Sequence, residues 1–223
     1  MTASYEAILA TIERLAADVR SGSDRRPPEL CALSGAADTE NGYYRLLYEI
    51  GREYAPTRIL EIGTFMGTSA AHLALGHPDC GTNIVTTVDS NEDAAEQVAG
   101  LGYRNIHAVT SDSVSYLRAR PGHPSKSTPL IAYIDGEHNF TQAYTEYGLC
   151  RELVGDRGIL LFDDIDLPMG TREMHVFWEY VVDPKVKLDG LHHTGFGAAV
   201  VDLSRPLPLW EEIITEATAR FAR

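Results

Sequence analysis

The sequence predicts an α/β fold, a doubly wound sheet of about seven strands with helices on both faces. Three observations predict it. Short runs rich in β-branched residues alternate five times with amphipathic stretches, a pattern typical of a mostly parallel sheet. The chain has 223 residues, enough for one sizeable core. Hydrophobic residues make up 44% of it and charged residues 23%, which are globular values and exclude a fibrous or disordered chain.

The first part of the chain predicts two helices. Apolar residues recur at helical spacing over 5–19, the polar stretch SGSDRRPP follows at 21–28, and a second helical pattern covers 39–54. We expect residues 1–38 to form an N-terminal helical extension that acts as a lid over a cleft or as a dimer arm. Residues 39–223 are expected to form a single domain.

The remaining elements alternate along the chain. The expected strands cover residues 58–63, 83–89, 105–110, 130–135 and 158–163. The helices between them are expected near residues 68–76, 91–100, 112–119 and 139–153. After the fifth strand we expect a helix over 171–182, two more strands, of which the last covers 197–203 and runs antiparallel, and a closing helix near 209–222.

Charge and cysteine content narrow the function. The chain carries 19 Lys+Arg against 32 Asp+Glu, and its net charge of −13 disfavours nucleic acid and anionic lipid as partners. No apolar run reaches the roughly 18 residues of a membrane helix, and the first twenty residues do not resemble a secretory signal. Three widely spaced cysteines suit a reducing cytoplasm and form no zinc motif. We therefore expect a soluble, cytoplasmic protein with a small-molecule partner.

The ends of the strands are where an open sheet of this kind binds ligands. The first strand runs into a glycine turn, Glu61-Ile-Gly63-Thr64-Phe-Met-Gly67-Thr-Ser69. Its glycines let the backbone approach a ligand and turn a helix N-terminus toward it. The G-x-x-x-G spacing differs from the dinucleotide-binding fingerprint, and the turn lacks the lysine of a P-loop.

Acidic and hydroxyl side chains follow the second and third strands. Asp89 lies 26 residues after Gly63, where a carboxylate can accept hydrogen bonds from both hydroxyls of a ribose. It can equally cap the helix that follows. Asp112 and Ser113 present the same choice between capping a helix and contacting an adenine amine.

Carboxylates end the fourth and fifth strands. Asp135, Asp163 and Asp164 are expected at adjacent strand ends, where they repel one another unless a cation lies between them. Oxygen ligands of this kind suit Mg²⁺, with Mn²⁺ and Ca²⁺ as alternatives. His138 follows Asp135 by three residues and is either a proton acceptor or a surface histidine. The pair His192-His193 is expected to be solvated.

Together these residues resemble the class I S-adenosylmethionine (SAM)-dependent methyltransferases. Within that class they are similar to the metal-dependent small-molecule O-methyltransferases, which include catechol, caffeoyl-coenzyme A and macrocin-type enzymes and the related cephalosporin-hydroxylase proteins. The resemblance covers about 39–203. It implies a Rossmann-like fold and methyl transfer from SAM to a hydroxyl of a small molecule, such as a natural-product sugar or phenol.

The resemblance also implies roles for the site residues. Gly63, Thr64 and Gly67 would approach the methionine part of SAM, with Ser69 near its carboxylate and Glu61 supporting the turn or the methionine end. Asp89 would hold the ribose, Asp112 or Ser113 would lie by the adenine, and Asp135, Asp163 and Asp164 would hold Mg²⁺. Catechol-type enzymes have Asn in place of Asp164 and Lys in place of His138, so the catalytic base is either His138 or Asp135.

Other functions share parts of this pattern. A metal-independent methyltransferase, acting on nitrogen or oxygen, would bind the same cofactor and ignore chelators. An NAD-dependent oxidoreductase shares the fold but has no need of three carboxylates. A non-catalytic protein would bind the cofactor without turnover. A homodimer is expected from the general frequency of dimers among soluble proteins.

Overall fold

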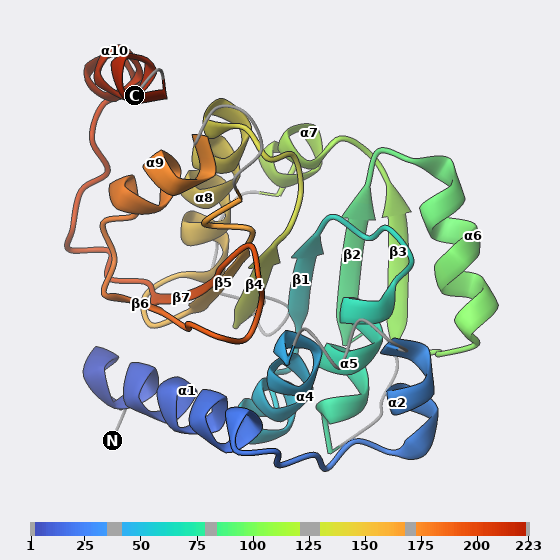
Figure 1. Ribbon diagram of the computed structural model, residues 1–223. Helices are drawn as coiled ribbons and strands as arrows, with labels where there is room; N and C mark the ends of the chain where they lie inside the picture. Colours follow the sequence, from blue (N-terminus) through green and yellow to red (C-terminus); the bar gives the residue numbers. More distant parts are fainter. Residues whose placement is uncertain (1–2, 35–41, 79–83, 121–129, 168–172, 222–223) are drawn as a thin grey trace.

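Seven strands form one sheet in the computed structural model, which describes residues 3–34, 42–78, 84–120, 130–167 and 173–221 (Figure 1). The strand order is β3-β2-β1-β4-β5-β7-β6. The strands are β1 (Ile59–Ile62), β2 (Val85–Asp89), β3 (Ile106–Thr110), β4 (Ile131–Ile134), β5 (Ile159–Asp163), β6 (Lys185–Lys187) and β7 (Phe196–Val200). All pairings are parallel except those of β7, which runs antiparallel to both β5 and β6. The predicted sheet is confirmed, including its antiparallel last strand.

The helices follow the predicted alternation and are labelled as in Figure 1. They are α1 (Tyr5–Arg20), α2 (Pro28–Ser34), α4 (Tyr43–Tyr54), α5 (Thr68–Gly76), α6 (Glu92–Leu101), α7 (Ser113–Arg118), α8 (Phe140–Val154), α9 (Glu173–Tyr180) and α10 (Trp210–Phe221). The α2 helix was not predicted. It begins at the end of the polar stretch with Pro28, a residue well suited to a first helical turn because that position needs no N–H donor. Residues 39–41, 83, 171–172 and 222 of the expected elements lie outside the described ranges.

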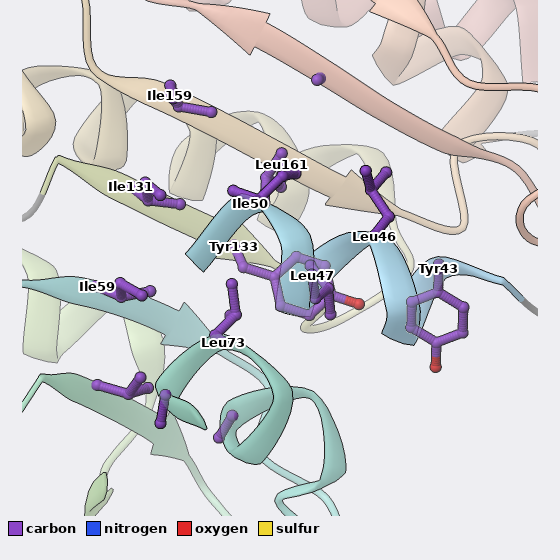
Figure 2. Close-up of a cluster of buried hydrophobic side chains, with 14 of the residues drawn as sticks. Tyr43, Leu46, Leu47, Ile50, Ile59, Leu73, Ile131, Tyr133, Ile159 and Leu161 are labelled. Atoms are coloured by element: carbon purple, nitrogen blue, oxygen red, sulfur yellow. The ribbon is translucent and has the colours of Figure 1, made fainter. Parts of the chain in front are cut away.

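One face of the sheet is covered by α1, α2, α4 and α5. Leu46, Leu47 and Ile50 of α4 pack over the central strands (Figure 2). The α1 helix joins the same core, because its apolar stripe from Ile12 to Val19 is buried and it packs against α4, β6 and β7. A role of this extension as a lid or dimer arm stays a prediction.

The other face is covered by α7, α8, α9 and α10. Its core is strongly aromatic, with Phe140 stacked on Tyr144 and Phe162 packed between Tyr147 and Phe177. The β1, β4, β5 and β7 strands are buried along their whole length, as expected for strands with helices on both sides. The doubly wound arrangement is confirmed.

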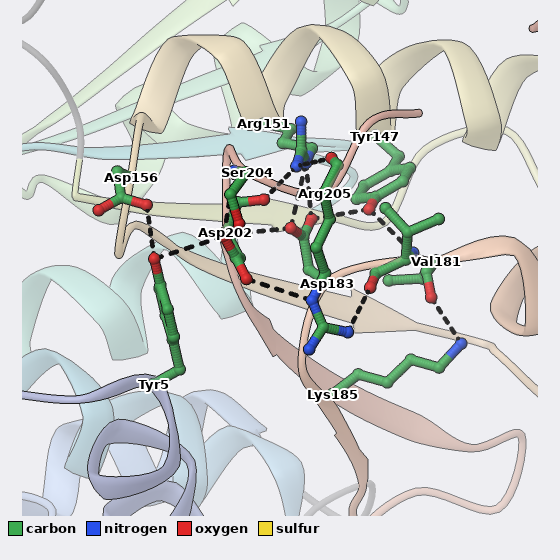
Figure 3. Close-up of polar contacts among 11 residues, drawn as sticks. Tyr5, Tyr147, Arg151, Asp156, Val181, Asp183, Lys185, Asp202, Ser204 and Arg205 are labelled. Atoms are coloured by element: carbon green, nitrogen blue, oxygen red, sulfur yellow. Dashed lines mark hydrogen bonds and ion pairs between the residues drawn. The ribbon is translucent and has the colours of Figure 1, made fainter. Parts of the chain in front are cut away.

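A buried ion pair fastens α8 to the segments that flank the β6–β7 hairpin (Figure 3). Arg151 donates from Nε to Asp183 Oδ2 at 2.9 Å, and the Tyr147 hydroxyl donates to the same oxygen at 2.7 Å. The second arm of the Arg151 guanidinium donates to the carbonyl oxygens of Asp202 and Arg205. These contacts fix the hairpin whose connecting loop reaches the carboxyl end of β5.

Within the described part of the chain, every helix is too short or too polar to cross a lipid bilayer.

Candidate active site

A cavity of about 710 Å³ lies at the carboxyl ends of β1, β2, β3 and β4. The chain reverses its strand order between β1 and β4, and open α/β sheets bind ligands at such switch points. The size falls within the range of sites for small molecules and cofactors. The cavity is lined by Ile62, Gly63, Phe65, Val88, Asp89, Ser90, Ser111, Asp112, Ser113, Asp135, Gly136, Glu137, His138, Gln142 and Glu146.

The turn that follows β1 has no room for a side chain at Gly63. Gly63 has φ +89°, and a Cβ atom there would lie 1.8 Å from the carbonyl oxygen of Asp135. Gly67 has φ +75°, precedes the first turn of α5, and donates its N–H to the Thr64 carbonyl at 2.7 Å. The turn therefore brings the β1 and β4 ends into direct backbone contact beside the cavity.

Glu61 lies behind this turn and is fully buried. Among the described residues neither of its carboxyl oxygens has a hydrogen-bond partner. Burial raises the pKa of Glu61 to about 8, so the side chain is mostly protonated at neutral pH. Glu61, Thr64, Gly67 and Ser69 are not among the described residues that line the cavity.

Asp89 joins the second strand end to the glycine turn. Its Oδ2 accepts hydrogen bonds from the N–H groups of Thr64 at 2.9 Å and Phe65 at 3.0 Å. Burial tends to raise the pKa of Asp89, but the backbone donors outweigh it and the pKa is lowered. The residue that caps α6 is Asn91 and not Asp89, because the Asn91 side chain accepts a hydrogen bond from the N–H of Asp93. Asp89 remains an ionised group in the cavity wall.

Asp112 and Ser113 both line the cavity, and both already have partners. Asp112 caps α7 by accepting from the N–H of Ser115 at 2.8 Å. The Ser113 hydroxyl donates to Glu146 Oε1 at 2.5 Å, and the Gln142 amide donates to the same oxygen at 2.9 Å. Gln142 and Glu146 were missed in the sequence because both lie within a helix, away from any strand end.

The three carboxylates that follow β4 and β5 are brought together as predicted. The Tyr133 hydroxyl lies 3.2 Å from Asp135 Oδ2 and 2.8 Å from Asp163 Oδ2. His138 Nε2 lies 2.8 Å from Asp164 Oδ2 and 3.7 Å from Asp135 Oδ1. Asp164 has φ +57°, a left-handed backbone conformation that residues other than glycine rarely adopt. His138 is thus in the cluster and is not an isolated surface histidine.

His192 completes the cluster, and the expectation that it is solvated is wrong. Its side chain is only 11% exposed, and its Nδ1 lies 2.7 Å from Asp163 Oδ1. The ring packs 4.6 Å from that of Tyr43. The antiparallel register that pairs Asp163 with Phe196 places the preceding loop beside the β5 end. That pairing is the signal that could have located His192.

The charges and hydrogen bonds of the cluster shift the pKa values of its members. Burial, together with the charges of Asp163 and Asp164, raises the pKa of Asp135 to about 7, although His138 opposes the shift. Hydrogen bonding to Asp135 and Asp164 raises the pKa of His138 to about 10. In the metal-free protein His138 is therefore an imidazolium that offsets part of the carboxylate charge.

Two overlapping sets of side chains have the geometry of metal ligands. Asp135, His138 and Asp164 form one, Asp163, Asp164 and His192 form the other, and the ligand atoms of each set lie within 4.8 Å of one another. Carboxylate oxygens suit Mg²⁺, Mn²⁺ and Ca²⁺. The donor set fits a hard divalent cation, and the two imidazoles add nitrogen donors at its edge.

Comparisons with known sequences agree with this geometry. A family model described as a methyltransferase domain matches residues 60–165. The O-methyltransferase hkm8 of Aspergillus hancockii is 33% identical over 115 residues, which are 49% of this chain and 43% of that protein. The chain thus spans less than half the length of this curated relative.

Solved structures share the fold over most of the chain. The O-methyltransferase from Bacillus cereus in complex with S-adenosylhomocysteine (SAH) has a TM-score of 0.61 at 19% identity, covering 86% of this chain and 100% of its own. TomG from Streptomyces achromogenes, an O-methyltransferase of tomaymycin synthesis solved with SAM, has a TM-score of 0.60 at 20% identity, covering 85% and 97%. Residues 60–165 are thus similar to a methyltransferase domain, and the chain has the fold of these solved methyltransferases.

Proposed function

We propose that this protein transfers a methyl group from SAM to a hydroxyl of a small molecule, with a divalent cation at the carboxylate cluster. The observation that carries the proposal is the contact between two features. A cofactor-sized cavity at the β1–β4 ends shares Asp135 and His138 with the cluster at the β4–β5 ends. A donor in the cavity and an acceptor at the cluster would thus meet.

The cavity residues fit SAM. Gly63 lines the cavity and would contact the methionine part. Thr64 and Gly67 of the same turn would lie beside it, with Ser69 near its carboxylate and Glu61 supporting the turn. Asp89 is ionised and would accept hydrogen bonds from the ribose, while Asp112 and Ser113 would lie by the adenine. The buried Oε2 of Glu146, a cavity-lining residue, has no partner among the described residues and supports a polar ligand in this region.

The carboxylate cluster fits Mg²⁺, with Mn²⁺ and Ca²⁺ as alternatives. Asp135, Asp163 and Asp164 would hold the ion. When bound, the cation supplies positive charge that lowers the pKa of an acceptor hydroxyl. The charge of a bound cation would also lower the pKa of His138 from its metal-free value, and the neutral ring would then accept the hydroxyl proton at Nε2, with Asp135 as the alternative base.

Methyl transfer from SAM depends mainly on the alignment of the acceptor oxygen, the methyl carbon and the sulfur. The acceptor oxygen attacks the methyl carbon as the bond from that carbon to the SAM sulfur breaks, and the electron pair returns to sulfur. Holding the two reactants in line can supply roughly 7–11 kcal/mol of the barrier. The rigid turn at Gly63 and the cluster held by Tyr133 are suited to this positioning.

Several finer features belong to the same proposal. We infer that the acceptor is a natural-product sugar or phenol with neighbouring oxygens, since two oxygens can face one cation. A homodimer and a cytoplasmic location are part of the proposal, supported by base rates and by the cysteine pattern of the sequence.

The test is methyl transfer from isotopically labelled SAM to a panel of catechols, sugars and alcohols, with Mg²⁺ or with excess chelator. We expect chelation and Asp163→Asn each to lower kcat by about 10–100-fold or more, because even the loss of a residue that only supports a metal ligand typically costs that much. Asp156→Asn, at an exposed carboxylate remote from the cluster, should retain activity. Transfer that survives both chelation and Asp163→Asn would contradict the metal-dependent mechanism.

A metal-independent methyltransferase is the second candidate. One observation favours it: Tyr133, His138 and His192 already provide hydrogen-bond or ion-pair partners for the three carboxylates. This reading predicts the same SAM binding and no effect of chelators. The family match favours either form of methyl transfer over a nicotinamide-dependent oxidoreductase.

A further inference from the structure

One end of the cavity is a polar patch built by α7 and α8. Ser113, Gln142 and Glu146 line it, and their side chains are joined by hydrogen bonds of 2.5–2.9 Å. Both donors converge on Oε1 of Glu146. The other carboxyl oxygen, Oε2, is buried and has no hydrogen-bond partner among the described residues.

This unpartnered oxygen indicates a missing donor. Glu146 is 1% exposed, and buried polar atoms in native proteins nearly always have a partner. Burial raises the pKa of Glu146, although the hydrogen bonds from Ser113 and Gln142 oppose that shift. A ligand that donates a hydrogen bond to Oε2 would remove the desolvation penalty.

Gly136 packs against the Glu146 carboxyl group in the wall of the cavity. A Cβ atom at Gly136 would lie 3.1 Å from Glu146 Oε1 and 3.2 Å from Oε2, in front of both oxygens. Gly136 does not have a positive φ, so its conformation does not require glycine. Gly136 and Glu146 line the same cavity, and a side chain at position 136 would crowd both carboxyl oxygens.

The sequence leaves two roles open for Asp112 and Ser113, capping a helix and contacting an adenine amine. Asp112 uses Oδ1 to cap α7, and the Ser113 hydroxyl gives its proton to Glu146. Among the described residues that line this end of the cavity, Glu146 has a buried acceptor, Oε2, without a donor.

We propose that Glu146 selects the base of the cofactor, with Oε2 accepting a hydrogen bond from the exocyclic amine of adenine. The inference rests on the proposed binding of SAM in this cavity. A cofactor whose base carries a carbonyl in place of that amine leaves Oε2 unpaired and opposite another acceptor. Sites that hydrogen-bond a ligand group reject analogues that lack it, because the buried partner is left unsatisfied.

The experiment compares the affinities of SAH and S-inosylhomocysteine, the same molecule with a carbonyl in place of the amine, by calorimetry on the full chain. The wild-type protein should prefer SAH by about tenfold or more. In Glu146→Gln the new amide can donate to the carbonyl, so the preference should fall to within about threefold. Glu152→Gln, the same change at an exposed position of α8, should keep the wild-type ratio.

A second variant, Gly136→Ala, keeps the proposal testable if Glu146→Gln does not fold. Gly136→Ala places a methyl group in front of the Glu146 carboxyl and should reduce the preference as well. A wild-type protein that binds both ligands equally, or variants that keep its preference, would overturn the role of Glu146 while leaving SAM binding intact. Failure of the wild-type protein to bind SAH would instead overturn the proposed function, and this inference with it.

Discussion

At the scale of single residues, Gly63 sets the shape of the cavity edge. Its positive φ is costly for other residues, and its Cα hydrogens face the Asp135 carbonyl with no room for a methyl group. Gly102 has the same kind of φ, but a Cβ atom there would meet nothing within 4 Å. Alanine substitution at Gly102 therefore measures the cost of backbone strain alone, whereas alanine substitution at Gly63 adds the cost of a steric clash.

Gly63→Ala should destabilise the protein by about 3 kcal/mol or more, because strain and a backbone clash combine. Gly102→Ala should cost only about 1 kcal/mol, from strain alone. Urea unfolding measures both. Equal losses in the two variants would show that the close approach to Asp135 does not limit residue 63.

Glu61 makes stability depend on pH. Its folded pKa of about 8 lies above the ordinary glutamate pKa of 4.5 expected in the unfolded chain, so the folded state binds more protons between these values. Stability of the metal-free, cofactor-free protein should therefore fall as pH rises from about 4.5 to 8, by at most on the order of 5 kcal/mol.

Glu61→Gln should flatten this dependence, whereas Glu152→Gln, on an exposed side chain, should leave it in place. Urea unfolding at pH 5, 6.5 and 8 provides the measurement. A slope that persists in Glu61→Gln would assign the pH dependence to other groups.

The site residues that could be predicted from the sequence all lie at the ends of predicted strands. Asp135, Asp163 and Asp164 end parallel strands, so the fold alone brings their side chains to one edge. His192 and Glu146 reach the site through a loop between antiparallel strands and through a helix interior. Their positions depend on pairing register and helix rotation, which no local pattern of one sequence reveals.

At the scale of elements, the β6–β7 hairpin is held by contacts far apart in the sequence. The Arg151–Asp183 pair joins α8 to the segment before β6, and both side chains are buried. Hydrophobic periodicity predicted α8 well because its buried face is regular, but the ion pair that orients it left no pattern in the sequence. The short α2 helix was missed because seven residues give too few turns for periodicity.

Asp183→Asn should destabilise the protein by about 3–5 kcal/mol, because it leaves the Arg151 guanidinium buried without a counter-charge. Glu179→Gln removes the partner of Arg220 on the surface, where such pairs contribute at most about 1 kcal/mol. Thermal and urea unfolding of both variants measure the difference. A small effect of Asp183→Asn would mean that water or a rearranged loop compensates Arg151.

At the scale of the whole molecule, the strand order brings donor and acceptor regions together. The β1 and β4 strands are neighbours in space although two strands separate them in the chain, and β5 follows β4. The cavity and the carboxylate cluster therefore meet at the β4 end, through Asp135 and His138. The alternation of strands and helices was enough to predict a doubly wound sheet with carboxylates at adjacent strand ends. It does not predict which acceptor binds, because that depends on individual side chains around the cavity.

The most direct test of the account is a calorimetric titration of the protein with SAH, with Mg²⁺ present and again after chelation. The account predicts binding in the micromolar range that Asp89→Ala weakens at least about tenfold, since the ribose would lose a charged acceptor. Mg²⁺ should not be required for this binding if the cation contacts only the acceptor. Absence of SAH binding under both conditions would contradict the assignment of the cavity to SAM.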